Sequence, residues 1–410
     1  MYFLFFLILL PRINEEPPVL FPYRGIYLSP FAAVKFKEYL PYIRNSEINC
    51  VVVDFKSAEG YVAYNTNVKF AKDIGSELSV INLENLMRVC RNEGIRLVGR
   101  IVVFQDSIFA WHANGEYSIK GLDGRIWKDG HGKYWVDPCL EEVRVYNIEI
   151  AKDLANRGVP EIQFDYIRFP SSTGDFRPYR TWCRNKEETI AKFLEEAREE
   201  LKKFGVKISG DIFGCVLWMP TLPNEGQSLK LMAPFLDVVC PMLYPSHFSK
   251  NHEWSEDPRE REYNVIFKSI ARGRKSTGES RFVPYIQGFD LRAPGFGPGY
   301  IENQITAVQD ARAWGYIVWH SAGRYDALWE LMNGRDMTLR VPTKTLRDKV
   351  REVIDEVGKD IELLGIKDGV VKIKLPTAYK RSPWEYQNAI KEVESKIKKR
   401  IPEVKHVKGV

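Results

Sequence analysis

Acidic side chains lie near the ends of apolar, strand-like runs, where a buried strand normally carries Val or Ile. In "EIQFDYIRF", Gln163 and Asp165 share one face because side chains alternate along a strand, and Asp211 ends the run "VKISGD". Two carboxyl groups that flank a glycosidic bond can hydrolyse it, since one protonates the leaving oxygen and the other acts as nucleophile or base. The pattern therefore makes Asp165 and Asp211 candidates for such a pair of carboxyl groups.

Seven further residues at strand ends are candidates for binding the substrate. Their side chains can hydrogen-bond sugar hydroxyls or stack against a sugar ring, and they are Asp54, Lys56, Arg168, Tyr244, His247, Gln287 and Trp319. Arg168 has the opposite alternation to Asp165, so we expect it to lie outside the barrel and to keep that carboxylate ionised. Loop tryptophans are further candidates for stacking on sugars, namely Trp127, Trp135, Trp218, Trp254 and Trp319.

The same residues allow other interpretations. An Asp near a strand end often caps a helix or joins a salt bridge, and Asp54 or Asp290 can replace Asp211 as the acid. Asp54 and Lys56 share a face of "VVVDFK" and can form a structural ion pair. Lys56 can instead form an imine with a carbonyl substrate, although Asp54 argues against this by holding its charge. A non-catalytic, glycan-binding protein would retain the same cleft.

Eight apolar runs alternate with helix-period segments between residues 24 and 323. They are "RGIYLSP", "NCVVVDFK", "IRLVGRIVVF", "EIQFDYIRF", "VKISGDIFG", "LDVVCPMLYP", "RFVPYIQGF" and "GYIVWHSAG". Several of the helical segments end at Gly, which supplies the left-handed residue that closes a helix. This alternation indicates a parallel sheet covered on its faces, and eight units predict an α/β (β/α)8 TIM barrel. The rival is an open doubly wound sheet, but no glycine-rich phosphate loop follows the first strand.

The pattern divides the chain into three segments. Residues 1–19 are an apolar N-terminal segment, residues 20–340 the predicted barrel, and residues 341–410 a small C-terminal extension. In the extension, "TKTLRDKVREVIDEVGKDIELLG" predicts a helix, "GVVKIKLP" a strand and "SPWEYQNAIKEVESKIKKR" a second helix. We expect either a small α+β element or a helical buttress against the barrel.

Composition is that of an ordinary globular protein. The 410 residues are 44% hydrophobic and 28% charged, with a net charge of +6. Basic residues are interleaved with acidic ones, so no focused basic patch supports a nucleic-acid partner. The six cysteines are scattered singly, without metal-ligand spacing, and Cys50, Cys215 and Cys240 are expected as buried small hydrophobes. The sequence therefore suggests neither a disulfide framework nor a metal, and leaves the oligomeric state open.

The N-terminus "MYFLFFLILLPRINEEPP" is apolar but too short to cross a bilayer. Its length suits the central region of a secretory signal, yet no Lys or Arg precedes it and no small-residue cleavage site follows. We expect a chain that is secreted or associated with the cell envelope, with a cytoplasmic location as the alternative.

Five segments together resemble a family of bacterial TIM barrels that is assigned to the glycoside hydrolases. The family was long classed as a domain of unknown function. They are "RGIYLSPFAA", "INCVVVDFKSAEGYVAYNT", "GIRLVGRIVVFQDSIFA", "KYWVDPCLEEVRVYNIEIAKDLANRGVPEIQFDYIRFPS" and "VCPMLYPSHF". The resemblance runs from about residue 24 to 335, and "QFDYIRFPS" and "PMLYPSHF" are its most specific parts. It implies a (β/α)8 fold and relatedness to enzymes that act on carbohydrates.

The alpha-amylase-like and alpha-galactosidase-like relatives of that family carry a nucleophilic Asp at the end of the fourth strand. Asp165 occupies the corresponding place here. The alpha-amylase-like relatives take their acid/base from the fifth strand, where this sequence has Asp211 rather than Glu. The resemblance thus implies Asp165 as nucleophile, or as electrostatic stabiliser of an oxocarbenium-like transition state, with Asp211 as general acid of raised pKa. Together with the strand-end carboxyl groups it leads us to expect hydrolysis of a polysaccharide or oligosaccharide. The expected substrate is a carbohydrate, and no cofactor is implied.

Overall fold

The computed structural model describes residues 23–171, 178–219, 221–249, 261–277, 281–333, 346–358, 361–367, 370–376, 383–401 and 404–409. The apolar N-terminal segment and Trp254 lie outside the described residues. The chain forms two compact units that meet in sequence at Gly334 and Arg335, and each unit is described by itself.

The first unit is a closed barrel of eight parallel strands, which confirms the predicted fold class. The sheet closes on itself because β1 pairs with both β12 and β2. The barrel strands are β1 (Tyr23–Leu28), β2 (Cys50–Lys56), β5 (Arg96–Val102), β7 (Glu161–Asp165), β9 (Lys207–Phe213), β10 (Val238–Met242), β11 (Tyr285–Gln287) and β12 (Gly315–Trp319). Each coincides with one of the eight runs predicted from the sequence.

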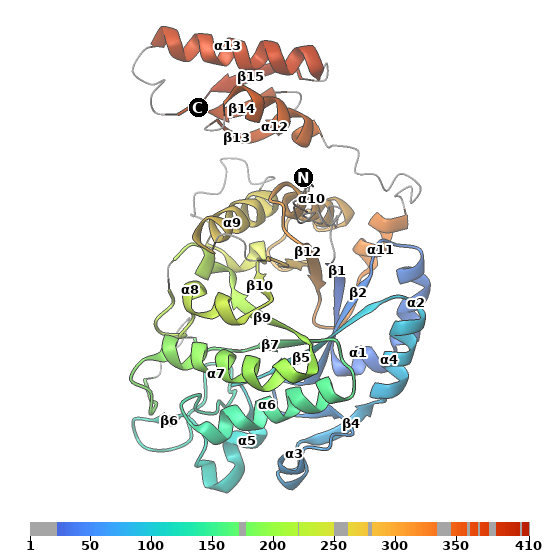
Figure 1. The fold of residues 1–410 in the computed structure, drawn as a ribbon, viewed down its shortest axis with the longest axis vertical. Coiled ribbons are helices and arrows are strands. Elements are labelled where there is room, and N and C mark those ends of the chain that lie inside the picture. Colours follow the sequence, from blue (N-terminus) through green and yellow to red (C-terminus); the bar gives the residue numbers. More distant parts are fainter. Residues whose placement is uncertain are drawn as a thin grey trace, which may run out of the picture. The chain divides into compact units, whose positions relative to one another are not determined.

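Helices cover the outside of the barrel (Figure 1). They are α1 (Pro30–Val34), α2 (Phe36–Arg44), α3 (Lys69–Asp73), α4 (Leu83–Asn92), α5 (Ser107–Trp111), α6 (Glu141–Asn156), α7 (Lys186–Leu201), α8 (Leu229–Met232), α9 (Arg261–Thr277), α10 (Pro298–Asp310) and α11 (Asp326–Asn333). Short 3-10 helices occupy His112–Gly115, Lys202–Phe204, Gly214–Leu217, Ala233–Phe235 and Pro245–His247. The predicted apolar stripe of α7 is buried, and its Phe193 ring contacts Phe104 and Phe164 with ring centroids 5.2 Å apart. The helices thus cover strands that are apolar on both faces.

Glycines join helices to strands in two different ways. Gly205 has φ 65° and ends the helical segment of α7 in the left-handed conformation, as predicted. Gly315 begins β12, where a Cβ would lie 1.8 Å from the carbonyl oxygen of Tyr23. The second glycine therefore allows β12 to approach β1 at the closing seam of the barrel.

The barrel interior is packed rather than hollow below its mouth. Inward-facing side chains such as Tyr23, Val52 and Val98 form one apolar cluster. Gln163 accepts a 2.5 Å hydrogen bond from the Tyr285 hydroxyl within this layer. Packing of this kind closes the lower barrel, so any site must lie at the strand ends.

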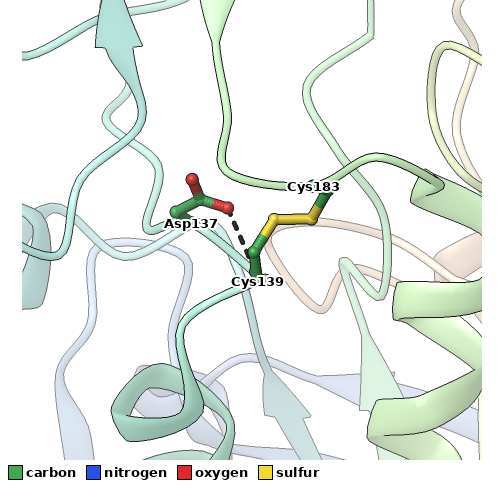
Figure 2. A group of neighbouring side chains, drawn as sticks. All are labelled: Asp137, Cys139 and Cys183. Carbon is green, nitrogen blue, oxygen red and sulfur yellow. Dashed lines mark hydrogen bonds between the residues drawn. A yellow bond between two sulfur atoms is a disulfide. The ribbon is translucent and has the colours of Figure 1, made fainter.

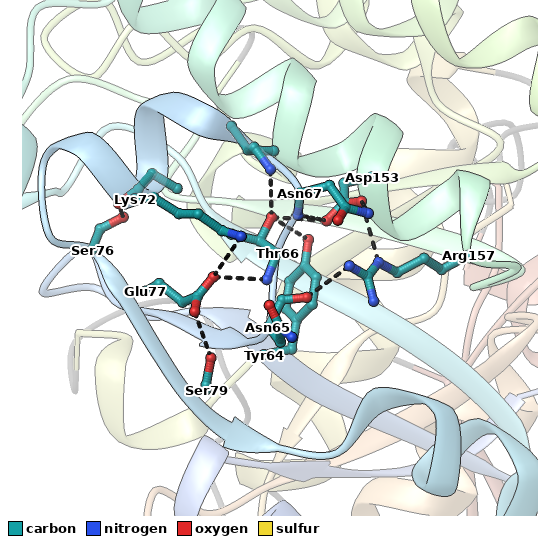
Figure 3. A network of polar contacts seen from close by, with 12 residues as sticks. Tyr64, Asn65, Thr66, Asn67, Lys72, Ser76, Glu77, Ser79, Asp153 and Arg157 are labelled. Atoms are coloured by element: carbon teal, nitrogen blue, oxygen red, sulfur yellow. Dashed lines mark hydrogen bonds and ion pairs between the residues drawn. The ribbon is translucent and has the colours of Figure 1, made fainter.

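A short excursion follows β2 and is fastened to α6 by polar contacts. It contains β3 (Val62–Tyr64), α3 and β4 (Glu77–Ile81), with β3 antiparallel to β2. Figure 3 shows Asp153 of α6 accepting hydrogen bonds from Thr66 Oγ1 at 2.8 Å and from the Asn67 backbone N–H at 3.1 Å. These bonds fix the excursion against the outer helix layer.

A disulfide joins the segments that precede α6 and α7. Cys139 and Cys183 are bonded with Cα atoms 5.4 Å apart, and Figure 2 shows Asp137 beside them. Nearby, β6 (Lys120–Gly121) pairs antiparallel with β8 (Tyr179–Arg180). The sequence interpretation, in which all cysteines stood singly, missed this bridge because the two residues are 44 positions apart.

The second unit has an αββαβ order and its own apolar core. Its elements are α12 (Leu346–Val357), β13 (Glu362–Lys367), β14 (Val370–Lys374), α13 (Pro383–Arg400) and β15 (His406–Gly409). The helix predicted through residue 365 ends at Val357, and "ELLGIK" is instead strand β13, antiparallel to β14. The predicted helical segment is long enough to be one helix, but its last residues pair with β14 and therefore form a strand. In the part of the chain that the structure describes, no helix is long and apolar enough to cross a membrane.

Candidate active site

A cavity of about 520 Å³ opens at the carboxyl ends of the barrel strands. Its wall includes the last residues of β7, β9, β10 and β12, which are Asp165, Phe213, Met242 and Trp319. This is the face of a (β/α)8 barrel at which reaction sites are built. Six of the nine predicted site residues line the cavity, namely Asp165, Asp211, Arg168, Tyr244, His247 and Trp319.

A single buried arginine gathers three carboxyl groups at the floor of the cavity. Arg100 of β5 forms ion pairs with Asp54 of β2, Asp165 of β7 and Asp211 of β9. Its Nε lies 3.2 Å from Asp211 Oδ2, and its two terminal nitrogens bond to Asp54 and Asp165. The Tyr27 hydroxyl donates a 2.7 Å hydrogen bond to the other oxygen of Asp54. Four adjacent barrel strands therefore meet in one charged cluster.

Burial and charge act differently on the members of this cluster. Desolvation, together with the neighbouring charge of Asp165, raises the pKa of Asp211 well above its ordinary value, although Arg100 opposes the shift. Burial also raises the pKa of Asp54. Although burial alone would lower the pKa of Arg100, the charges of Asp54 and Asp165 raise it well above its ordinary value. Asp211 is thus the carboxyl group best placed to hold a proton, as a general acid must.

The backbone turns sharply immediately after Asp165. Tyr166 has φ 53°, a left-handed conformation that is uncommon for a residue with a large side chain, and its N–H donates to Asp165 Oδ1. The turn ends the strand alternation, so Arg168 lines the cavity together with Asp165. The expectation that Arg168 lies outside the barrel and keeps Asp165 ionised was therefore wrong in its geometry. Arg100 makes the ion pair with Asp165 instead.

Aromatic side chains line another part of the cavity. Trp319 lies 5.6 Å from Tyr244 and 5.8 Å from Tyr27 between ring centroids, and Tyr244 lies 5.4 Å from His247. Burial and the charge of Arg292 lower the pKa of His247, so its ring is neutral near pH 7. A neutral aromatic wall beside carboxyl groups suits the apolar face of a sugar ring.

Lys56 points away from the cavity. The pairing of β2 with β5 shifts register between Asp54 and Lys56, so the two side chains do not share a face. Lys56 is instead completely buried, pairs with Asp106 at 2.7 Å and donates to the carbonyl oxygen of Val102 at 2.8 Å. The predicted Asp54–Lys56 ion pair, substrate contact and imine-forming role of Lys56 are therefore wrong.

Asp54 and Gln287 also have structural partners, and the described lining of the cavity does not include them. Asp54 is held behind Arg100 by the bonds given above. The Gln287 amide accepts from the Ser246 N–H at 3.0 Å and donates to the carbonyl oxygens of Phe289 and Leu291, both at 2.9 Å. Gln287 thus ties together the loops that follow β10 and β11.

Most of the candidate tryptophans pack against other side chains and do not line the cavity. Trp127 lies against Tyr179, with ring centroids 5.1 Å apart. Trp135 lies beneath Arg168, and Trp218 donates to Ser269 at 2.7 Å. Among the described tryptophans, Trp319 is the one that lines the cavity.

The polar residues of the cavity wall that sequence reasoning missed include Arg100, Glu225 and Cys215. Arg100 had a signal, because a charged residue inside the apolar run "RLVGRIV" needs buried partners. Glu225 comes from the loop after β9, and no local pattern marks it. Cys215 was expected to be buried, but it is partly exposed to the cavity.

One group of side chains has the composition of a metal site. Ligand atoms of Asp137, Cys139 and Cys183 lie within 4.8 Å of one another. The disulfide joins the two sulfurs, and Asp137 accepts hydrogen bonds from Cys139 N–H, Thr181 Oγ1 and Trp182 N–H at 2.9–3.0 Å. These ligand atoms are thus already bonded to other atoms of the protein. The group fits a structural bridge rather than a metal centre.

Comparison with known proteins bears on the fold and on the family of the chain. No curated protein matches the chain. A hypothetical protein from Ruminiclostridium thermocellum is 34% identical over 45% of this chain and 96% of its own, with a TM-score of 0.42. The PgaB (BpsB) glycoside hydrolase domain from Bordetella bronchiseptica is 12% identical over 77% of this chain and 99% of its own, with a TM-score of 0.58. The beta-galactosidase from Marinomonas ef1 is 11% identical over 81% of this chain and 60% of its own, with a TM-score of 0.55. The last two likenesses support the barrel fold.

A family model described as "Putative glycosyl hydrolase domain" matches residues 25–325. The matched region contains every barrel strand from β2 to β12 and all the residues of the cavity wall. The chain therefore belongs to this glycosyl hydrolase family of TIM barrels.

Proposed function

We propose that the chain hydrolyses a glycosidic bond of a polysaccharide or oligosaccharide, with Asp211 as general acid and Asp165 as its partner carboxylate. The observation that carries the proposal is the sharing of Arg100 by these two carboxyl groups at the cavity floor. Burial and the neighbouring charge of Asp165 raise the pKa of Asp211 and so favour a proton on it. Two carboxyl groups in different protonation states are what glycoside hydrolysis requires.

In this mechanism Asp211 donates its proton to the leaving oxygen of the scissile bond. Asp165 accepts hydrogen bonds on both oxygens, from Arg100 and from the Tyr166 N–H, which fix its orientation. It then attacks the anomeric carbon to form a glycosyl ester that water hydrolyses, or it stabilises the positive charge that develops there while water attacks that carbon. Arg100 orients both groups and offsets part of the negative charge of the cluster throughout.

The aromatic wall supplies the binding surface. Trp319 and Tyr244 line the cavity and are positioned to stack on sugar rings, with His247 at their edge. Burial raises the pKa of Tyr244 well above its ordinary value, so its phenol remains a neutral hydrogen-bond donor. Stacking with a few directed hydrogen bonds orients a sugar without requiring a charged ligand.

The test is a panel of bacterial and plant polysaccharides assayed for release of reducing ends. The double variant Asp165→Asn/Asp211→Asn serves as the blank, because it keeps the shape of the cavity and removes both carboxyl groups. Asp237→Asn is the matched control, since Asp237 precedes β10 at the opposite end of the barrel and bonds to the Ile208 N–H at 2.9 Å. Release by wild type and Asp237→Asn, but not by the double variant, is expected. Glycan binding by all three without release would instead assign the cavity to a binding protein.

A further inference from the structure

A second arginine in the cavity has a different environment from Arg100. Arg168 lines the wall near Asp165, Ser171 and Glu225. Its guanidinium lies over the rings of Trp135, Tyr166 and Phe213, at 4.8, 4.9 and 4.6 Å from their centroids. Three rings hold the guanidinium in place through cation–π contacts, so its position is fixed before any ligand arrives.

Most of the hydrogen-bonding capacity of Arg168 is unused within the described part of the chain. A guanidinium carries five N–H donors, and here one bond reaches the Phe169 carbonyl oxygen at 3.0 Å. Asp165 and Glu225 act on Arg168 electrostatically, but no carboxylate of the described residues forms an ion pair with it. The Glu225 carboxylate accepts from Ser171 Oγ at 3.0 Å instead.

The contrast with Arg100 indicates that the unused donors of Arg168 bind a ligand. Arg100 bonds to three carboxylate partners, one through each of its three nitrogens. Arg168 is held by apolar rings, with its remaining donors on a cavity wall where a ligand can reach them. Desolvated donors without acceptors are costly, so the missing acceptor is supplied by solvent or by a ligand.

We propose that Arg168 binds the carboxylate of an acidic sugar unit, so that the substrate class of this cavity is a uronic-acid-containing glycan. This inference rests on the proposed function, because it names the substrate of that same site. The planar guanidinium fork matches the two oxygens of a carboxylate, and the flanking rings exclude water from the contact. A sulfate or phosphate group would share the charge but not this planar geometry.

The probes are sodium D-glucuronate and D-galacturonate, with D-glucose and D-galactose as the neutral counterparts. Dissociation constants are measured by ligand-observed NMR at constant salt on the wild type, Arg168→Gln, Arg168→Lys and Glu225→Gln. We expect the uronates to bind the wild type about tenfold more tightly than the neutral sugars, as for hydrogen bonds to a charged group. Arg168→Gln should remove that preference and leave neutral-sugar binding unchanged. Arg168→Lys, which keeps the charge but lacks the fork, should retain part of it.

Glu225→Gln is the matched control, because it removes a nearby negative charge without touching Arg168. It should strengthen uronate binding and leave neutral-sugar binding unchanged, which would place the ligand carboxylate in the cavity. The Arg168 variants then decide whether Arg168 binds that carboxylate. If Arg168→Gln does not fold, Arg168→Lys and Glu225→Gln carry the test.

Several results would overturn the proposal. They are equal affinity of the wild type for uronates and neutral sugars, a preference that survives Arg168→Gln, or competition by inorganic sulfate as strong as that by uronate. Uronate-selective binding without any hydrolysis would remove the proposed hydrolase while keeping this inference. Hydrolysis of neutral polysaccharides that Arg168→Gln does not affect would keep the proposed hydrolase and remove the inference about uronic acids.

Discussion

At the residue scale, the site depends on how one guanidinium is shared. Arg100 contacts three carboxyl groups with a single positive charge, so the cluster carries an excess of acid in a desolvated place. The excess is relieved most simply by keeping a proton on Asp211, the carboxyl group with the strongly raised pKa. The same imbalance that makes the cluster costly to bury thus prepares it for acid catalysis.

Asp211→Asn should change the pH dependence of stability as well as activity. A carboxyl group with a raised folded pKa contributes stability below its unfolded pKa, near 4, and loses that contribution as pH rises through the folded pKa. Asn does not titrate, so the melting temperature of the variant relative to wild type should increase from pH 4 to pH 8. Thermal unfolding across this range measures the difference. A difference that is constant with pH would show that Asp211 titrates normally.

Arg100→Met should destabilise the barrel most strongly near neutral pH. Leaving buried carboxylates without their cation costs about 3–5 kcal/mol in free energy of unfolding. The uncompensated carboxyl groups would bind protons more tightly in the folded chain, so the loss should shrink toward pH 4. Urea unfolding at pH 4 and pH 7 measures both values, with Arg100→Lys as the charge-preserving control. An equal loss at both pH values would point to lost packing instead.

At the element scale, the strands were predictable and the directions of their last side chains were not. The runs that became β2, β7 and β9 are locally apolar, which is enough to mark a strand. Alternation also placed Gln163 and Asp165 correctly. It failed for Lys56, where a bulge against β5 shifts the register, and for Arg168, where Tyr166 turns the chain. The bulge depends on pairing with β5, which is distant in sequence, and the left-handed turn falls on a tyrosine, a residue type that does not mark such a turn.

The bulge in β2 creates a buried ion pair on the outer face of the barrel. Lys56→Met would leave Asp106 buried without its cation, although Asp106 would still cap α5 through the Phe109 N–H. We expect a loss of about 3–5 kcal/mol in free energy of unfolding, with hydrolysis retained at temperatures where the variant is folded. Urea titration and a reducing-end assay check the two parts. The double variant Lys56→Met/Asp106→Asn should recover part of the lost stability, and a failure to recover any would argue against the pair.

At the scale of the whole molecule, closure of the barrel assembles the site. Asp54, Arg100, Asp165 and Asp211 are spread over more than 150 positions of sequence and belong to four neighbouring strands. The sequence predicted the barrel and therefore the convergence of the two catalytic candidates. It could not show which basic residue would lie between them, because that depends on strand register.

The disulfide contributes to the molecule through a long closed loop. A bridge across 44 positions lowers the entropy of the unfolded chain, which corresponds to about 4 kcal/mol of stability. Cys139→Ser/Cys183→Ser should therefore melt at a lower temperature than the wild type, and reductant should lower the melting temperature of the wild type alone. Differential scanning calorimetry with and without reductant decides the matter. No effect of reductant on the wild type would contradict a formed bridge.

We propose from the same bridge that the chain matures in an oxidising compartment, outside the cytoplasm. Structural disulfides persist in secreted and envelope proteins and are rare in the cytosol. Thiol labelling of the chain from its native host tests this proposal: Cys139 and Cys183 should resist labelling until reduced, and free thiols at both positions would refute it.

The most direct test of the central claim is the rate of reducing-end release by Asp165→Asn beside the wild type, on a polysaccharide that the wild type cleaves. The substitution preserves the size of the side chain at the floor of the cavity and removes its charge. We predict a loss of about a thousandfold or more, with binding of the polysaccharide largely retained. Equal rates for the two proteins would remove Asp165 from the reaction and contradict the account of the cluster around Arg100.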